Sequence, residues 1–166
     1  KSTTALRLAL AGFPLLTDSM VFVDGDGFLH GYPVGLAKLR GDMVAQFPEL
    51  RPFLQTEIVR QETKYRIDLR AVASDFVQET AVRPQKIILC LLSRHEKEET
   101  VVEDVGETAV IQAILQNSLY VDQPHVWQQN AKNLQKLLVG ETAVALRLGI
   151  DPMQLIRAVE KVIQYP

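Results

Sequence analysis

Two kinds of hydrophobic spacing alternate along the chain. At its start, Leu6, Ala9 and Leu10 fall on one helical face behind a group of hydroxyl residues. Gly12 follows, at a place where a residue in the left-handed conformation commonly ends a helix. The pattern therefore predicts a helix from the first residues to just before Gly12.

The next stretch changes to the short apolar runs that are typical of β structure. Residues 14–17 and 20–23 are apolar, and a polar pair separates them. The sequence Asp-Gly-Asp-Gly at 24–27 supplies the residue types that tight two-residue turns require. We expect a hairpin at this turn, with a strand at 28–30 that pairs back.

Helix and strand patterns mix in the middle of the chain. Residues 42–47 and 49–59 have helical spacing, interrupted by prolines that suit helix starts better than helix interiors. Residues 64–69 alternate between polar and apolar side chains, as in a half-exposed strand. Residues 86–92 are almost entirely apolar, which predicts a central strand that is buried on both faces.

The last third of the chain indicates further strands and helices. We expect strands at 101–102 and 142–148 and helices at 107–119, 125–139 and 153–163. Asp151 and Pro152 suit the N-cap and first turn of the last helix. Because strands precede most helices, the fold class is α/β or α+β, with a mixed sheet and flanking helices. The length of 166 residues, without repeats or a low-complexity linker, favours a single domain.

Composition argues against several classes of protein. The 18 Lys and Arg residues against 20 Asp and Glu give a net charge of -2, so we expect no nucleic-acid partner. The longest strictly apolar run, 87–92, is far shorter than the roughly 20 residues of a membrane helix. We therefore expect no membrane partner and a cytoplasmic location. Cys90 is the only cysteine, which excludes an intrachain disulfide. The three histidines are far apart and have no partner at metal-ligand spacing, which argues against zinc.

Candidate chemistry begins with Lys1, Ser2 and Thr3. A lysine followed by a hydroxyl residue at a helix N-terminus is the way a phosphate-binding P-loop ends. The ammonium meets the β- and γ-phosphates, the hydroxyl ligates Mg²⁺, and the helix start offers unpaired N–H groups. A motif of three residues also occurs at ordinary solvated helix starts, so both interpretations stay open on these residues alone.

The continuation of this motif resembles a known family. Lys1–Leu6 and Gly12–Asp18 together are similar to the P-loop helix, the glycine and the carboxylate-ended strand of HPr kinase/phosphorylase C-terminal domains. Further similar segments follow in the order of the divergent members: His30–Pro33, Leu36–Leu39, Phe47–Leu50, Lys64–Arg66 and Ile87–Arg94. The resemblance covers most of the chain. It implies the P-loop core of HPr kinase and phosphoenolpyruvate carboxykinase, in which a strand and the glycine-rich part of the P-loop would precede Lys1.

The resemblance also implies a set of site residues. The residues expected to contact the nucleotide phosphates are Lys1, Ser2, Thr3, Lys38 and Lys64. Asp18 is implied as the general base, and Ser2 and Asp18 as Mg²⁺ ligands. The implied cofactors are ATP and Mg²⁺, and the implied partner is a protein or peptide with an acceptor hydroxyl, such as a serine. The reaction is in-line phosphoryl transfer, which places Asp18 within about 10 Å of Lys1 at the end of a strand. A homo-oligomer is compatible with the family.

Departures from the family pattern keep a second interpretation open. Ser19 stands where the family has a second carboxylate, which affects magnesium binding and the reverse reaction. The signature of true HPr kinases is also missing, so HPr itself is not the expected substrate. The alternative is a catalytically inactive nucleotide-binding or scaffold domain of the same fold. In that interpretation Asp18 is a turn residue, and Lys38, Arg40 and Lys64 belong to the solvated surface.

Overall fold

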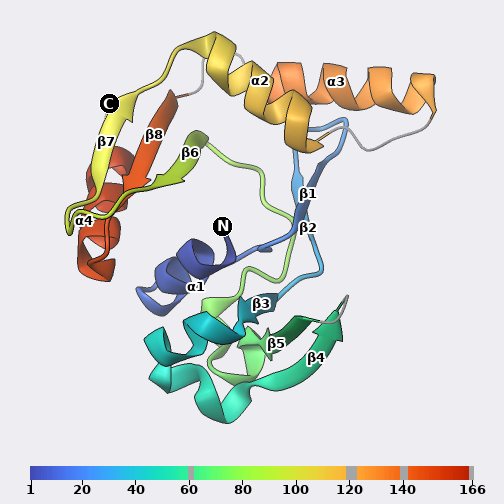
Figure 1. Cartoon of the computed structure of the whole chain (residues 1–166). Coiled ribbons are helices and arrows are strands. Elements are labelled where there is room, and N and C mark those ends of the chain that lie inside the picture. Colours follow the sequence, from blue (N-terminus) through green and yellow to red (C-terminus); the bar gives the residue numbers. More distant parts are fainter. Residues whose placement is uncertain (60–61, 119–122, 139–141, 165–166) are drawn as a thin grey trace. The chain divides into compact units, whose positions relative to one another are not determined.

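The chain is a mixed α/β protein with three small sheets and neighbouring helices, represented by a computed structural model (Figure 1). The structure describes residues 1–59, 62–118, 123–138 and 142–164. The expected class, a mixed sheet with flanking helices, is confirmed at this level. The chain divides into two compact units, of which the first comprises residues 1–22 and 29–82 and the second residues 23–28 and 83–166. A single domain over residues 1–166 stays a prediction.

Helix α1 (Ser2–Leu10) opens the first unit, as the sequence predicts. Gly12 follows it with φ 92°. The N–H groups of Gly12 and Phe13 donate to the carbonyls of Ala9 and Leu8, at 3.0 Å each. These two bonds satisfy carbonyl groups that a helix C-terminus otherwise leaves unpaired. Glycine suits this position because it adopts a positive φ without a steric penalty.

The segment after α1 differs from the expectation. Residues 14–17 form no strand, and Leu15 makes only an isolated parallel bridge to Val77. The proline that opens this segment has no N–H group to contribute to a ladder. Asp18 follows the irregular segment and precedes strand β1 (Met20–Val23). It therefore lies ahead of a strand and not, as expected, at the end of one.

Strand β1 pairs with β2 (Leu29–Tyr32) in the predicted hairpin. Its turn differs in length from the expected two residues, because the N–H of Asp24 donates to the carbonyl of Phe28 at 3.1 Å and leaves three residues between them. Gly27, the last of the three, has φ 83°. The Asp24 carboxylate closes the turn by accepting from the N–H groups of Asp26 and Phe28, at 3.0 and 2.9 Å. This local bonding favours the longer turn.

The first unit contains an antiparallel sheet in the order β3-β5-β4. Its strands are β3 (Leu36–Arg40), β5 (Glu62–Asp68) and β4 (Gln55–Val59). Strand β5 confirms the alternating pattern seen in the sequence. The helix expected over 49–59 is wrong for its second half, because that half pairs with β5. Cross-strand pairing outweighs weak helical spacing at β-branched residues such as Ile58.

Short 3₁₀ helices connect these strands. They are η1 (Gly41–Gln46), η2 (Pro48–Phe53), η3 (Leu69–Ala71) and η4 (Ser74–Phe76). The first two replace the α-helices expected in this region. Pro48 begins η2, as predicted, but Pro52 lies inside it. A proline there lacks the N–H that an α-helix would need, so the helix stays short.

One face of the β3-β5-β4 sheet is buried against α1 and the 3₁₀ helices. The buried core contains Leu6, Ala9, Ala37, Leu39, Phe47, Leu50, Ile67, Leu69 and Val77. The Arg7 guanidinium lies over the Phe47 ring, with its carbon 4.1 Å from the ring centre, and donates to the carbonyl of Gln46. Because side chains of a strand alternate between its two faces, the residues between these core positions project away from α1.

The second unit is built on a mixed sheet in the order β6-β8-β7. Its strands are β6 (Ile88–Arg94), β8 (Thr142–Leu148) and β7 (Val101–Asp104). Strand β8 pairs parallel with β6 and antiparallel with β7. Within the described residues β6 is therefore an edge strand, and the expected central position of residues 86–92 is wrong. Both β6 and β8 are apolar, and composition alone does not say which of them pairs on both sides.

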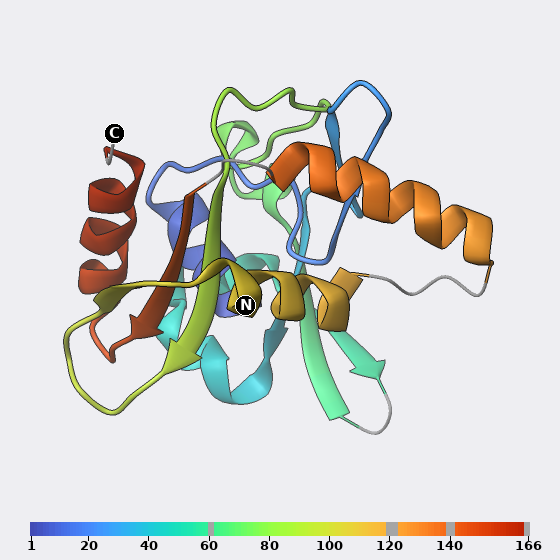
Figure 2. The same cartoon turned by 90° about the horizontal axis from the view of Figure 1, so that it is seen from above.

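The helices of the second unit agree with the sequence. They are α2 (Glu107–Ser118), α3 (Pro124–Leu138) and α4 (Pro152–Ile163), while the expected helix ends at 119 and 139 lie outside the described residues. Asp151 caps α4 as predicted, because its Oδ1 accepts from the N–H of Met153 at 2.9 Å. Helix α4 lies beside β8, with Val162 packed against Val144 and Leu146 (Figure 2). None of the helices in the described part of the chain is long and apolar enough to cross a membrane.

Candidate functional site

The expected phosphate-binding residues Lys1, Ser2 and Thr3 lie at the start of α1. Lys1 is the N-cap residue, and its carbonyl accepts the first helical hydrogen bond from Ala5 at 3.0 Å. The Lys1 side chain does not cap the helix and is exposed. The N–H groups ahead of Ala5 therefore have no acceptor within the helix, and they carry the partial positive charge of its N-terminus. This helix start is suited to an anion.

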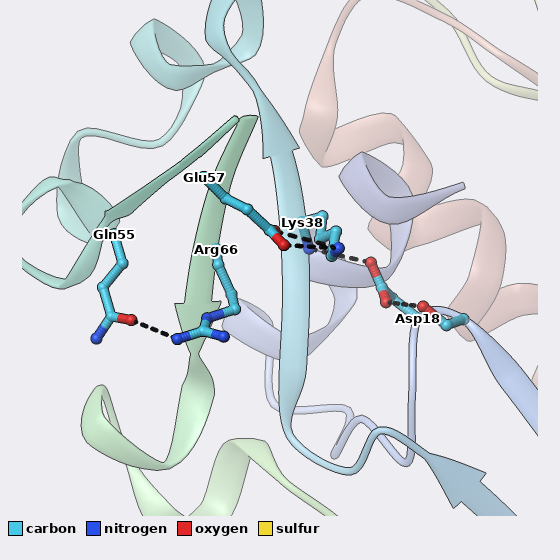
Figure 3. A network of polar contacts seen from close by, with 6 residues as sticks. Asp18, Lys38, Gln55, Glu57 and Arg66 are labelled. Carbon is cyan, nitrogen blue, oxygen red and sulfur yellow. Dashed lines mark hydrogen bonds and ion pairs between the residues drawn. The ribbon is translucent and has the colours of Figure 1, made fainter. Parts of the chain in front are cut away.

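Asp18 is oriented by a hydrogen bond to each of its carboxylate oxygens. Oδ2 accepts from the backbone N–H of Lys38 at 3.2 Å, and Oδ1 accepts from the hydroxyl of Ser19 at 2.9 Å (Figure 3). Lys38 lies in β3, which is an edge strand of its sheet in the described residues. An edge strand presents N–H groups that need acceptors, and Asp18 supplies one. Each oxygen keeps a lone pair, so the carboxylate can still accept a proton.

Asp18 lies next to a group of cationic side chains on the exposed face of the β3-β5-β4 sheet. We name this face the cation face. It carries Lys38, Arg40, Lys64 and Arg66, together with Gln55 and Glu57 of β4 and Asp68 of β5. The sheet register places Lys38 opposite Arg66 and Arg40 opposite Lys64. Two of the expected site residues, Lys38 and Lys64, therefore share one face and neighbouring strands.

Carboxylate and amide groups contact some of these cations (Figure 3). The Lys38 ammonium lies 3.1 Å from Oε2 and 3.5 Å from Oε1 of Glu57. The Arg40 guanidinium donates two bonds to the Asp42 carboxylate, at 3.1 and 3.0 Å. Arg66 donates to the uncharged side chain of Gln55 at 2.9 Å. The cations of this face are thus neutralised unequally.

The expected site falls into two groups. Helix α1, whose N-cap is Lys1, packs against the buried face of the sheet, whereas Lys38 and Lys64 project from the opposite face. Asp18 lies at the edge between the two faces, bonded to β3. Phosphate contacts of Lys38 and Lys64, and a separation of about 10 Å between Lys1 and Asp18, stay predictions.

Arg66 and Glu57 belong to this arrangement, although the sequence pattern did not identify them as site residues. The signal for Arg66 is present in the alternating pattern of residues 64–69, since it puts Lys64 and Arg66 on the same face. Glu57 lies in a segment with helical spacing, so the sequence offered no reason to place it beside Lys38.

Ser2 and Asp18 are the expected Mg²⁺ ligands. In the part of the chain that the structure describes, no three His, Cys, Asp or Glu side chains converge as a ready-made metal site. Magnesium in kinases is usually held by one or two carboxylates together with substrate phosphates and waters. A hydroxyl and a carboxylate are ligand types that Mg²⁺ accepts, and joint binding of an ion by Ser2 and Asp18 stays a prediction.

The second unit holds a separate hollow of about 300 Å³. The turn at 24–27 lines it from one side, and Arg83, Asn133 and Lys136 line it further. Two carboxylates of the turn and two cations face the same space, so its charge favours neither an anion nor a cation. The Nδ2 of Asn133 donates to the carbonyl of Val23 at 3.3 Å. This hydrogen bond joins α3 to the residue that precedes the turn.

Comparisons of the chain with protein-family models, with curated proteins and with solved structures find no match. The resemblance to HPr kinases therefore rests on the segments quoted from the sequence. A functional assignment depends on those segments and on the geometry around α1, Asp18 and the cation face.

Proposed function

We propose that this protein transfers the γ-phosphoryl group of ATP to a hydroxyl group, in the manner of HPr kinase-like proteins, and that the acceptor is a serine of a protein or peptide. The observation that carries the proposal is the start of α1, where Lys1 and Ser2 stand at an N-terminus that the Lys1 side chain leaves uncapped. Lysine, hydroxyl and helix N–H groups in this order are the elements of a phosphate site. The Asp18 carboxylate, which two hydrogen bonds orient, is a second observation that supports the proposal.

In this mechanism α1 and Asp18 have different tasks. The helix start and the Lys1 ammonium hold the β- and γ-phosphates and offset their charge. Asp18 takes the proton of the acceptor hydroxyl while that oxygen bonds to the γ-phosphorus and the bond to the bridging oxygen of ADP breaks. The proton then passes from Asp18 to solvent. Bound Mg²⁺, with Ser2 and Asp18 as its protein ligands, would supply positive charge at the phosphates.

Nucleotide titration of the full-length protein tests the proposal. We expect Lys1→Ala to weaken ATP·Mg²⁺ binding at least about tenfold, because a charge-assisted contact to the phosphates is lost. Lys161→Ala, at an exposed lysine of α4, is the matched control and leaves the affinity unchanged. Equal ATP affinity of Lys1→Ala and the unmutated protein contradicts the proposal.

A specific observation favours a second candidate, a nucleotide-binding or scaffold domain without catalysis. Ser19 occupies the position of the family's second carboxylate, and its hydroxyl is bonded to Asp18 at 2.9 Å. Transfer of labelled phosphate from ATP to serine-containing peptides separates the two candidates. ATP binding without any transfer by the full-length protein supports the second.

A further inference from the structure

We infer that the cation face binds an acidic segment of the acceptor protein and thereby presents its hydroxyl to Asp18. The inference rests on the proposed function, which supplies the acceptor serine, and adds to it the chemistry of the peptide around that serine. It is carried by the charge distribution on the β3-β5-β4 sheet and by the hydrogen bond that joins Asp18 to this sheet.

Cations stand directly opposite each other on this face. Lys38 is in register with Arg66, and Arg40 is in register with Lys64. Like charges at directly opposed positions destabilise a sheet. Packing of the core does not require these charges, because they project from the face opposite to the core.

The opposed cations also have the closer of the two spacings found in antiparallel sheets. The N–H of Lys38 donates to Asp18 and so points away from β5, which makes Lys38 and Arg66 a non-hydrogen-bonded pair. Arg40, two residues further along β3, forms the same kind of pair with Lys64. Side chains in such pairs are nearer to one another than in hydrogen-bonded pairs.

Two carboxylates of the chain pair with Lys38 and Arg40, while the Arg66 guanidinium bonds to an uncharged group. Glu57 is paired with Lys38 at 3.1 Å, and Asp42 is paired with Arg40 at 3.0 Å. Arg66 is exposed and donates to a neutral amide, and Asp68, two residues further along the same face of β5, is bonded to the Arg70 guanidinium by two hydrogen bonds. A carboxylate from a partner can therefore bind the Arg66 guanidinium without displacing a carboxylate of this chain, and arginine favours such planar two-bond contacts.

An acidic peptide fits this face better than a nucleic acid does. Among the described side chains of the cation face there is no aromatic ring on which a base could stack. Glu57 lies among the cations, where a continuous phosphate backbone would meet it. The net charge of the whole chain, -2, also lacks the positive excess of nucleic-acid binders.

The position of Asp18 sets the spacing that we expect in the peptide. Asp18 lies on the outer side of β3, while Arg66 lies on the next strand inward. With neighbouring strands about 4.8 Å apart and Asp18 one such step outside β3, about 10 Å separate the carboxylate from the Arg66 strand. An extended peptide advances about 3.3 Å per residue, so acidic residues about three positions from the serine reach Arg66.

Fluorescence anisotropy with the full-length protein, without nucleotide, tests the inference. The probes are two labelled peptides with one serine each. One has a glutamate at the third position before the serine and at the third position after it, and the other has glutamines at these two positions. We expect the glutamate peptide to bind at least about tenfold more tightly at low ionic strength, and the difference to shrink as salt is added. Equal binding of the two peptides overturns the inference.

Three variants locate the binding on the cation face. Arg66→Glu should weaken binding of the glutamate peptide at least about tenfold, since it replaces an attraction by a repulsion. Arg51→Glu makes the same change of charge at an exposed arginine of η2 and should alter binding less than about twofold. Glu57→Gln should tighten binding about two- to fivefold, the range of one exposed ion pair. Misfolding cannot raise the affinity for the peptide. Tighter binding by Glu57→Gln would therefore show that the weaker binding of Arg66→Glu does not come simply from loss of the fold.

The outcomes separate this inference from the proposed function. Binding of the glutamate peptide by a full-length protein that transfers no phosphate supports the cation face and contradicts the kinase. Phosphate transfer to both peptides at equal rates and affinities supports the kinase and overturns the inference. Tighter binding of a single-stranded oligothymidine than of the glutamate peptide, lost in Arg66→Glu, also overturns it in favour of nucleic acid.

Discussion

Lys38 and Arg66 face each other across β3 and β5 as directly opposed residues of an antiparallel pair. On the same strand, the backbone of Lys38 donates to Asp18, the candidate base, at 3.2 Å. Lys38 thus takes part in a repulsive charge pair and also supports the Asp18 carboxylate. Removing a cation from this face should raise the free energy of unfolding, because it relieves the repulsion, and should weaken the binding of an acidic peptide.

Neutralising Arg66 should stabilise the fold. Arg66→Gln removes the positive charge opposite Lys38, and its amide can still bond to the Gln55 side chain. We expect the free energy of unfolding to rise by about 0.2–1 kcal/mol, the usual size of a cross-strand pair. Urea denaturation measures the change, with Arg51→Gln as a control that leaves stability unaltered. A double-mutant cycle with Lys38→Gln isolates the term between the two cations, and a coupling that is zero or favourable contradicts a repulsion between Lys38 and Arg66.

Substitutions of Asp18 should distinguish its structural task from its chemical one. Asp18→Ala removes the acceptor of the Lys38 N–H and should lower the free energy of unfolding by about 0.5–1.5 kcal/mol. Asp18→Asn keeps an oxygen acceptor and should be the more stable of the two variants. Because an amide cannot take the proton but its oxygen can still ligate Mg²⁺, Asp18→Asn should abolish phosphoryl transfer while ATP affinity is kept. Denaturation, ATP titration and a transfer assay on both variants measure these effects, and full transfer by Asp18→Asn reduces Asp18 to a structural residue.

Asp68 should make stability depend on pH at acidic values. The side-chain hydrogen bond from Arg70 is the main cause that holds the pKa of the Asp68 carboxyl below its ordinary value of 3.8. A carboxyl with a lowered pKa in the folded state stabilises the fold above its unfolded pKa, and this contribution disappears as the pH falls through the folded pKa. The two side chains are 37% and 44% exposed, so the effect is small.

Asp68→Asn tests this dependence. The amide oxygen can still accept from the N–H of Arg70, so the variant removes chiefly the charge. We expect a lower Tm than that of the unmutated protein at about pH 7, and a Tm difference that shrinks as the pH falls through the lowered pKa of Asp68. Calorimetry across this range measures the difference. A difference that stays constant with pH would show that the Asp68 charge is not its source.

Gly149 should tolerate no side chain. A Cβ atom at this position would overlap the carbonyl oxygens of Glu98 and Glu99. The approach is fixed by hydrogen bonds, among them Ile150 N–H to the Lys97 carbonyl at 3.0 Å. The backbone must move to accept a methyl group, so we expect Gly149→Ala to lower the free energy of unfolding by about 1–3 kcal/mol.

Gly106 provides the matched control for this effect. It precedes α2, and a Cβ built there meets open space. Because Gly106 is the N-cap residue of α2, where alanine is less favourable than glycine, Gly106→Ala should lower the free energy of unfolding only by about 0.5–1 kcal/mol. Chemical denaturation of both variants compares them, and equal effects would mean that the contact between Gly149 and the Glu98 carbonyl is absent.

Features that depend on local backbone chemistry can be predicted from the sequence of this protein. Gly12 ends α1 because glycine readily accepts the positive φ of that position, and Asp151 with Pro152 begins α4 because their preferences are satisfied within one helical turn. The placement of Lys1 and Ser2 at a helix start follows from the same kind of signal. These features involve few residues that are close in sequence, so composition and spacing are sufficient to predict them.

The pairing of the strands, in contrast, follows only from the tertiary structure. The apolar runs of β6 and β8 look alike, and only pairing put β8 between two neighbours and, within the described residues, β6 at an edge. Residues 55–59 became a strand because β5 offered partners for their N–H and C=O groups. The juxtapositions of Asp18 with the Lys38 N–H, and of Lys38 with Arg66, arise in the same way. Strand pairing distributes its free energy over segments far apart in the chain, so no single segment encodes its partner.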